Sequence, residues 1–165
     1  MSDATTVILR ARGGHVLLRR AVASDLAVII ELLADDPISA SRGDRANDDD
    51  LPAYERAFAA IDSDPAQELL VVDDHGDVVG TMQLTLIPGL ARQGAHRLQI
   101  EAVRVRSDRR SAGIGAAMMT WAIEQAPHRG ATLVQLTSDA ARVDAHRFYE
   151  RLGFTASHVG FKLRV

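Results

Sequence analysis

A short basic segment between a strand pattern and a helix pattern constrains this chain more than any other feature. Residues 103–115, VRVRSDRRSAGIG, begin in an apolar alternating run and end where helical spacing begins. Small residues allow the backbone to approach a ligand closely, and the first N–H groups of a helix have no intrahelical partners. Together with the helix dipole, these donors favour a phosphate or pyrophosphate. Arg109 and Arg110 add positive charge, so we predict an anion-binding turn.

This turn differs from two common phosphate-binding motifs. A P-loop requires a lysine directly after the second glycine of a GxxxxGK run, and the sequence has none. A dinucleotide-binding fingerprint requires a third small residue where Met118 stands. The alternative without function is a glycine-containing helix start that binds no ligand.

Hydrophobic periodicity predicts a single α/β domain over residues 15–165, preceded by a tail or extra strand over residues 1–14. The predicted strands are 15–21, 68–73, 78–87, 97–105, 131–137 and one or two within 154–165. The predicted helices are 25–34, 51–61, 114–126 and 143–152, with a long loop over 35–50. The mixture of elements, with at least one hairpin, indicates a mixed (α+β) sheet with helices on both faces.

Local patterns indicate where several elements begin and end. Ser24 suits the N-cap of the first helix, and Asp25 suits the positive end of its dipole. Pro127 is expected to stop the third helix, and Gly153 to follow the fourth. Residues 131–137, ATLVQLT, are typical of a central strand.

Composition excludes several classes of protein. The net charge is −3, but residues 21–75 hold 14 acidic and 3 basic side chains, whereas residues 76–165 hold 7 and 12. With no strong basic patch and only 4% aromatic residues, a nucleic-acid partner is not expected. The chain shows no signal peptide or membrane span, so a cytoplasmic protein without a membrane partner is expected. The six histidines form no metal-binding pattern, and the absence of cysteine excludes a cysteine nucleophile.

Two segments together resemble the GCN5-related N-acetyltransferase (GNAT) superfamily. Arg110, Gly113 and Gly115 fill the pattern [Arg/Gln]-x-x-Gly-x-[Gly/Ala] of that family. The second segment, DAHRFYERLGF, matches its pattern A-x-x-[Phe/Leu]-Tyr-x-[Lys/Arg]-x-Gly-Phe. The order of elements is also similar, so the resemblance covers about residues 15–165 and implies the GNAT acyl-CoA acyltransferase fold.

The resemblance implies transfer of an acetyl group from acetyl-CoA to an amine. The backbones of Val103 and Val105 would pair with the pantetheine arm, and the turn would hold the pyrophosphate. The expected coenzyme-binding residues are Val103, Arg104, Val105, Arg109, Arg110, Ser111, Ala112, Gly113, Ile114, Gly115, Ala116 and Arg142. Two positions depart from the family pattern: Ser111 stands where glycine is frequent, and Arg142 where many relatives have asparagine.

Acetyl transfer needs a group that accepts a proton from the amine and a group that assists the departing thiolate. Tyr149 would lie near the thioester sulfur and is the candidate acid, although it could instead only position the thioester. Glu101 interrupts the apolar strand two residues before Val103, so strand alternation places both on one sheet face and makes Glu101 the candidate base. It could alternatively be a structural partner, with water relaying the proton. Gln99 lies on the same face and cannot act as a base.

The expected partners are acetyl-CoA and an amine acceptor. The preferred interpretation is direct transfer of the acetyl group to a primary amine of a small molecule, in a ternary complex without a metal. The Asp-rich segment 44–50 favours a cationic acceptor, although its aspartates could simply cap the second helix. A protein or peptide acetyltransferase and a non-catalytic acyl-CoA-binding regulatory domain are the alternatives. A homodimer is possible by family resemblance.

Overall fold

The computed structural model describes residues 6–36, 47–163 and 165, and its centre is one six-stranded sheet. The strands lie in chain order: β1 (Thr6–Ala11), β2 (Gly14–Arg20), β3 (Gln67–Asp74), β4 (Asp77–Ile87), β5 (His96–Val105) and β6 (Ala131–Leu136). Neighbouring strands are antiparallel except β5 and β6, which are parallel. The predicted mixed α/β sheet is confirmed.

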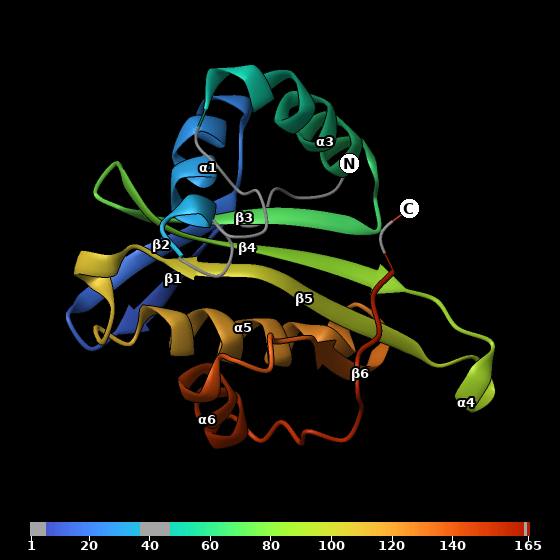
Figure 1. Cartoon of the computed structure of the whole chain (residues 1–165). Coiled ribbons are helices and arrows are strands. Elements are labelled where there is room, and N and C mark those ends of the chain that lie inside the picture. The colour runs from blue at the N-terminus through green and yellow to red at the C-terminus, as the bar shows by residue number, and fades with distance from the viewer. Residues whose placement is uncertain (1–5, 37–46, 164) are drawn as a thin grey trace.

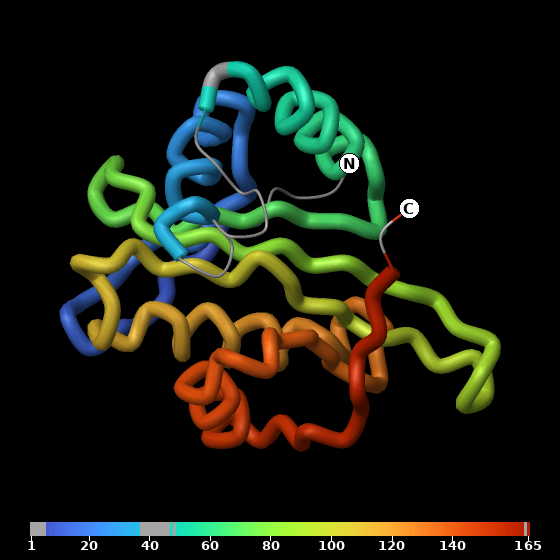
Figure 2. The backbone as a smooth tube through the Cα atoms, viewed as in Figure 1, coloured from blue at the N-terminus to red at the C-terminus, as the bar shows by residue number. Residues whose placement is uncertain are grey.

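Helices cover both faces of this sheet (Figure 1). On one side lie α1 (Leu26–Ala34) and α3 (Leu51–Ser63), and on the other lie α5 (Ile114–His128) and α6 (Val143–Arg151). The shorter helices are η1 (Ala23–Asp25), η2 (Asp48–Asp50), α4 (Ala91–Gly94) and η3 (Ser107–Arg109). The tube view shows that η3 and α5 follow directly from the end of β5 (Figure 2).

The two sheet faces bury separate apolar clusters. The larger lies against α5 and joins strand residues such as Leu70 and Ile100 to Met118 of the helix. The smaller lies against α1 and α3 and includes Ile29 and Val71. Helix α5 buries the side predicted from its spacing, with Ile114, Met118, Trp121 and Ala122 all buried. The face under α5 therefore supplies most of the apolar stabilisation, since this scales with buried area.

The start of α1 is attached to the sheet by a buried carboxylate. Asp25 accepts a hydrogen bond from the Val22 N–H at 2.8 Å and two from the Arg19 guanidinium at 2.7 and 3.0 Å. Hydrogen bonding to Arg19 lowers the pKa of Asp25. The prediction that Ser24 caps this helix is wrong, because Ser24 lies within η1 and Asp25 makes the capping contact.

Three other local predictions are corrected. Pro127 does not stop α5, which continues to His128, because a proline one position from the end disturbs little of the helix. Strand β6 lies at the end of the described strand order instead of its centre, since an apolar run does not by itself determine strand position. The described residues after Phe154 form no strand, although Val159, Phe161 and Leu163 alternate as strand residues do, and these side chains are exposed.

Within the described ranges, no helix has both the length and the apolar character needed to cross a membrane. The same residues contain no group of three or more metal-binding side chains.

Candidate active site

Strand β5 has two structurally different halves. Its first half pairs with β6 from His96↔Ala131 to Ile100↔Leu136, whereas in the described structure residues 101–105 pair only with β4. Ala102 has a φ of 52°, and the register with β4 shifts at this point, which is a β-bulge. The bulge and the loss of β6 pairing leave one backbone edge of residues 101–105 without a strand partner in the described structure. The carbonyl oxygens of Val103 and Val105 accept side-chain hydrogen bonds from Arg104 and Arg110 at 2.8 and 3.2 Å.

The bulge also changes which side chains share a sheet face. Glu101 pairs with Gln83, and Arg104, three residues later, pairs with Thr81. Glu101 and Arg104 therefore face α1, whereas Val103 packs against the core cluster under α5. The prediction that Glu101 and Val103 share a face is wrong, because the extra residue of a bulge reverses the alternation.

Gly80 of β4 permits this close approach. A Cβ atom at Gly80 would lie 3.0 Å from the Arg104 carbonyl oxygen and 3.4 Å from the Val72 side chain. Any larger residue would therefore push the bulge away from β4. Sequence reasoning missed this role, and the only available indication was a glycine inside an otherwise apolar strand pattern.

The predicted anion-binding turn connects the end of β5 to α5. Ser111 and Gly113 have positive φ values of 67° and 81°, and Gly113 is the N-cap of α5. The first helical hydrogen bond runs from the Ala117 N–H to the Gly113 carbonyl oxygen, so the N–H groups of residues 114–116 have no partner within the helix. The observed backbone therefore has the donor arrangement expected of a phosphate-binding helix start.

The turn between β1 and β2 contacts the backbone of the anion-binding turn and supports it. The Arg12 N–H donates to the Ala112 carbonyl oxygen at 2.8 Å, and a Cβ atom at Gly113 would meet the Arg12 Cγ at 3.2 Å. Sequence analysis left residues 1–14 as a tail or extra strand and did not identify this contact. Gly13 and Gly14 after an apolar run were the available indication of a hairpin turn.

The arginines around the turn form ion pairs within the protein. Arg109 pairs with Asp74, and Arg110 pairs with Asp35 at 3.1 Å while donating to the Val105 carbonyl oxygen at 3.2 Å. Asp35 lies at the end of α1 and lines a cavity of about 390 Å³ between that helix and residues 106–107. Arg110 thus connects β5, the turn and α1.

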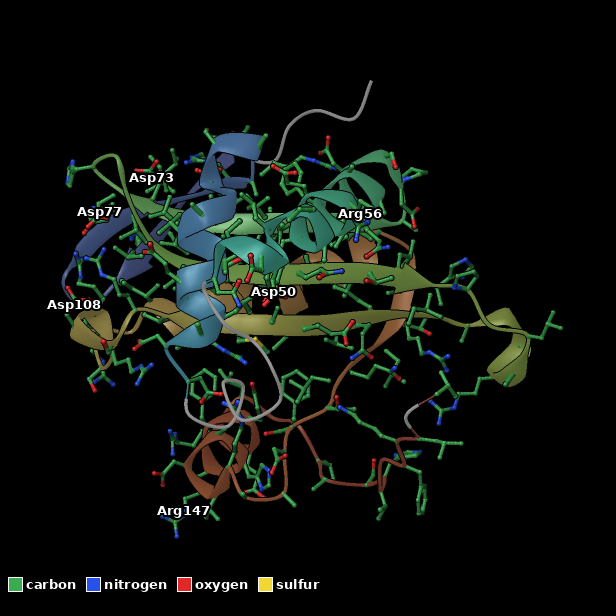
Figure 3. All side chains as sticks on the ribbon, turned by 45° about the horizontal axis from the view of Figure 1, so that its top comes forward. Asp50, Arg56, Asp73, Asp77, Asp108 and Arg147 are labelled. Atoms are coloured by element: carbon green, nitrogen blue, oxygen red, sulfur yellow. The ribbon has the colours of Figure 1, made fainter. Side chains whose placement is uncertain are left out.

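Arg106, which was not among the predicted site residues, organises the neighbouring hairpin end. It bonds to Asp77 and to Asp108 at distances of 2.9 and 2.7 Å, and Figure 3 shows both aspartates at the same end of the sheet. Hydrogen bonds to Asp108 and Asp77 raise the pKa of Arg106, and this guanidinium lowers the pKa of both carboxyls. Because these groups are exposed, they contribute mainly to loop geometry.

Tyr149 lies half-buried on α6 among aromatic and cationic side chains. Its ring is 5.3 Å from that of Phe148 and 6.0 Å, edge-on, from that of Phe154. Burial raises the pKa of Tyr149, while the charges of Arg104 and Arg142 act in the opposite direction. The phenol is therefore protonated at neutral pH and can donate a hydrogen bond.

Asp36 joins the two arginines beside Tyr149. Its carboxylate pairs with Arg142, the N-cap residue of α6, and lies 3.9 Å from the Arg104 guanidinium. Sequence analysis singled out neither Asp36 nor its contacts. The available indication was an Asp-Asp pair directly after the first predicted helix, but no local pattern shows which arginines it meets.

Glu101 is exposed and makes no ion pair or hydrogen bond within the described part of the chain. Gln99, on the same face, is buried and accepts a hydrogen bond from Gln135 at 2.6 Å. Gln67, Gln83 and Thr85 continue this polar surface across β3 and β4. The face of the sheet toward α1 and α3 therefore has a polar portion beside Glu101, in contrast to the apolar face under α5.

Comparison with known proteins agrees with this geometry. Residues 28–154 match the model of the Acetyltransferase (GNAT) family. An aminoalkylphosphonate N-acetyltransferase of Salmonella typhimurium is 34% identical over 115 residues, which cover 70% of this chain and 74% of that protein. A Bacillus halodurans structure described as a transcriptional regulator has a TM-score of 0.87 and 44% identity, covering 92% of this chain and 100% of its own. For a putative acetyltransferase from Agrobacterium tumefaciens the TM-score is 0.76 and the identity 29%, with 90% and 99% coverage. The chain belongs to the GNAT acetyltransferase family.

Proposed function

We propose that this protein transfers the acetyl group of acetyl-CoA to a primary amine of a small molecule. The observation that carries the proposal is the protonated phenol of Tyr149, which lies within electrostatic reach of Arg104 on the half of β5 without a β6 partner. The preceding residue, Phe148, lies 3.8 Å from where a Cβ atom at Gly115 of the turn would be. The N-acetyltransferase from Salmonella, whose described substrates are aminoalkylphosphonates, supports a small-molecule amine. Transfer within a ternary complex fits a chain that has no cysteine for an acyl-enzyme.

The residues of β5 and the turn suit acetyl-CoA. The backbone at Val103 and Val105 would pair with the pantetheine arm, and the turn from Arg110 to Ala116 would bind the pyrophosphate through its N–H groups. The positive φ values at Ser111 and Gly113 and the unpaired donors at the start of α5 are the features that fit such a group. When bound, the coenzyme supplies the thioester whose carbonyl carbon the amine attacks.

Tyr149 would assist the departing thiolate. A protonated phenol can donate a hydrogen bond or a proton to the sulfur as the carbon–sulfur bond breaks. Its contacts with Phe148 and Phe154 restrict the ring, so little orientational freedom is lost when the reaction begins.

Glu101 would accept the proton that the attacking amine loses. An amine with a pKa near 10 is mostly protonated at neutral pH, so a base must accept a proton before or during attack. The carboxylate of Glu101 is exposed and lies on the face of β5 toward α1, so this role requires the amine to approach from that face. A chain of water molecules could connect the two, or water alone could carry the proton away.

Two variants test the proposal against a non-catalytic role. Tyr149→Phe and Glu101→Gln are assayed for coenzyme A release with a panel of amines, and acetyl-CoA binding is measured in parallel. We expect Tyr149→Phe to lower kcat by roughly 10²- to 10⁴-fold while acetyl-CoA still binds. Tyr54→Phe, at the only other tyrosine, and Glu124→Gln, at an exposed site on α5, are the matched controls.

A second candidate function is a non-catalytic acyl-CoA-binding regulatory domain. The Bacillus halodurans structure described as a transcriptional regulator favours it. If wild-type protein binds acetyl-CoA but never exceeds the uncatalysed rate with any amine or peptide, the regulatory function replaces the enzyme. Turnover with peptides but not small amines would instead support a protein acetyltransferase. The cationic acceptor stays a prediction, because residues 44–46 of the Asp-rich segment lie outside the described residues.

A further inference from the structure

We propose that Arg104 and Arg142 bind a phosphoryl oxyanion, a phosphonate or phosphate, carried by the acceptor only a few bonds from its amine. This inference rests on the proposed function and defines the substrate class of the same site. It assigns the two side chains to the acceptor, whereas the family resemblance assigned both Arg104 and Arg142 to the coenzyme.

The two guanidinium groups come from separate elements but lie beside the same carboxylate. Arg104 leaves the bulged end of β5, and Arg142 lies at the start of α6, yet both meet the Asp36 carboxylate at the end of α1. Their side chains are only 19% and 22% exposed, which restricts their rotamers. Arg104 also donates to the Val103 carbonyl oxygen at 2.8 Å. Each guanidinium has five donors in a planar fork, so an arginine that already has partners within the protein can also bind an oxyanion.

These arginines lie beside the proposed reaction centre. Arg142 precedes Tyr149 by seven residues, about two helical turns, so both lie on the same side of α6. Both arginines also act electrostatically on the Tyr149 hydroxyl. An aminoethyl linkage spans only about 4 Å with bonds near 1.5 Å, so an acceptor amine at the thioester would place its oxyanion in this neighbourhood.

The bulge makes this arrangement possible. In a regular strand Val103 would share a face with Glu101, but the extra residue brings Arg104 to that face instead. The candidate base and the oxyanion-binding arginine therefore project from one side of β5. A short zwitterionic acceptor has matching groups, with an ammonium to be deprotonated and an oxyanion to be held.

The test compares acceptors that differ only in the oxyanion. Rates are measured for 2-aminoethylphosphonate and for ethylamine with wild type, Arg104→Gln, Arg142→Gln and the control Arg147→Gln. Arg147 is an exposed arginine of the same helix and points away from the sheet (Figure 3). We expect Arg104→Gln and Arg142→Gln to lower kcat/KM for the phosphonate by roughly 30- to 1,000-fold, chiefly through KM. The loss with ethylamine should be at least about tenfold smaller than the loss with the phosphonate, because ethylamine has no oxyanion for the arginines to bind.

Wild-type protein provides an independent readout if a variant fails to fold. Methylphosphonate should inhibit competitively against the amine and not against acetyl-CoA. Arg142→Lys should recover part of the phosphonate preference, because it keeps the charge but not the planar fork.

Three results would overturn the inference. These are equal losses for phosphonate and ethylamine, a matching loss of acetyl-CoA affinity in Arg142→Gln, or a wild-type enzyme that does not prefer the phosphonate. Each is distinct from failure of the proposed function, which would appear as no coenzyme A release with any amine.

Discussion

The two ends of helix α1 place the same pair of residue types, aspartate and arginine, in different surroundings. At its start, Asp25 bonds to Arg19, which also bonds to Asp73 of β3 at 3.2 Å. At its end, Asp35 and Asp36 reach arginines of the anion-binding turn, β5 and α6. The contacts of Asp25 join the helix to a part of the sheet in which every strand is paired on both sides. The contacts of Asp35 and Asp36 border the half of β5 that has no β6 partner.

This contrast shows that an aspartate–arginine pair does not reveal its role by chemistry alone. Where strands are paired on both sides, the backbone N–H and C=O groups are already hydrogen-bonded. There we expect the aspartate–arginine pair only to stabilise the fold. Where the backbone edge is open, we propose that the guanidinium groups bind a phosphate or phosphonate in addition to the carboxylate that positions them. Changing one carboxylate at a time should separate these roles.

The largest expected effect on stability is at the start of α1. Asp25→Asn should lower the free energy of unfolding by about 1.5–3 kcal/mol, because it removes charged hydrogen bonds from a buried site. Chemical denaturation measures the loss, while kcat/KM should stay within about twofold of wild type. A large loss of activity in a folded variant would show that the two ends of α1 are not independent.

At the other end, activity should change more than stability. Asp36→Asn should lower kcat/KM by roughly 10- to 100-fold, because Arg104 and Arg142 lose the carboxylate that positions them. Steady-state rates and denaturation curves are measured together. Asp144→Asn, at an exposed position of α6 that pairs with Arg147, is the control. A variant that is unstable but fully active per folded molecule would make Asp36 a structural residue like Asp25.

The stabilisation by Asp25 at the start of α1 should also depend on pH. Since Arg19 lowers the pKa of Asp25 in the folded protein, its stabilisation is present above the unfolded value near 3.9 and is lost as pH falls through the folded pKa. The stability difference between wild type and Asp25→Asn should therefore shrink below about pH 4. A difference that is constant down to the folded pKa would mean that Asp25 is not bound as its charged form.

Asp35 should have a small effect on coenzyme binding. It shares the exposed guanidinium of Arg110, a residue of the proposed pyrophosphate site. Exposed ion pairs contribute about 0.2–1 kcal/mol, so Asp35→Asn should tighten acetyl-CoA binding by roughly 1.4- to 5-fold in calorimetry. Weaker binding would show that Asp35 instead holds Arg110 in its binding position.

The smallest expected change is at Ser111. Its positive φ disfavours a side chain by about 1–2 kcal/mol, but glycine gives back part of this through unfolded-state entropy, so Ser111→Gly should stabilise by about 1 kcal/mol or less. Gly113→Ala should act in the opposite direction, because φ is positive there and the new Cβ would meet Arg12. Denaturation of both variants checks the sign. Destabilisation by Ser111→Gly would contradict the observed backbone.

Much of the fold could be predicted because its elements have strong local patterns. The helical spacing of Ile114, Met118 and Ala122 correctly indicates the buried side of α5. The position of β6 within the sheet could not be predicted in this way. Nor could the finding that the described residues after Phe154 form no strand. Strand pairing depends on which edges are free in the folded chain, and similar alternation occurs whether or not a partner strand is present.

The proposed site likewise has a part that the sequence predicts and a part that it does not. By itself the sequence determines a turn of small residues, SAGIG, leading into a helix, because backbone freedom and the start of a helix are local properties. Only the tertiary structure decides that Glu101 shares its face with Arg104 and that Asp36 meets Arg142. The first depends on the register between two strands. The second depends on two elements distant in the sequence, the end of α1 and the start of α6, that become neighbours only when the sheet is assembled.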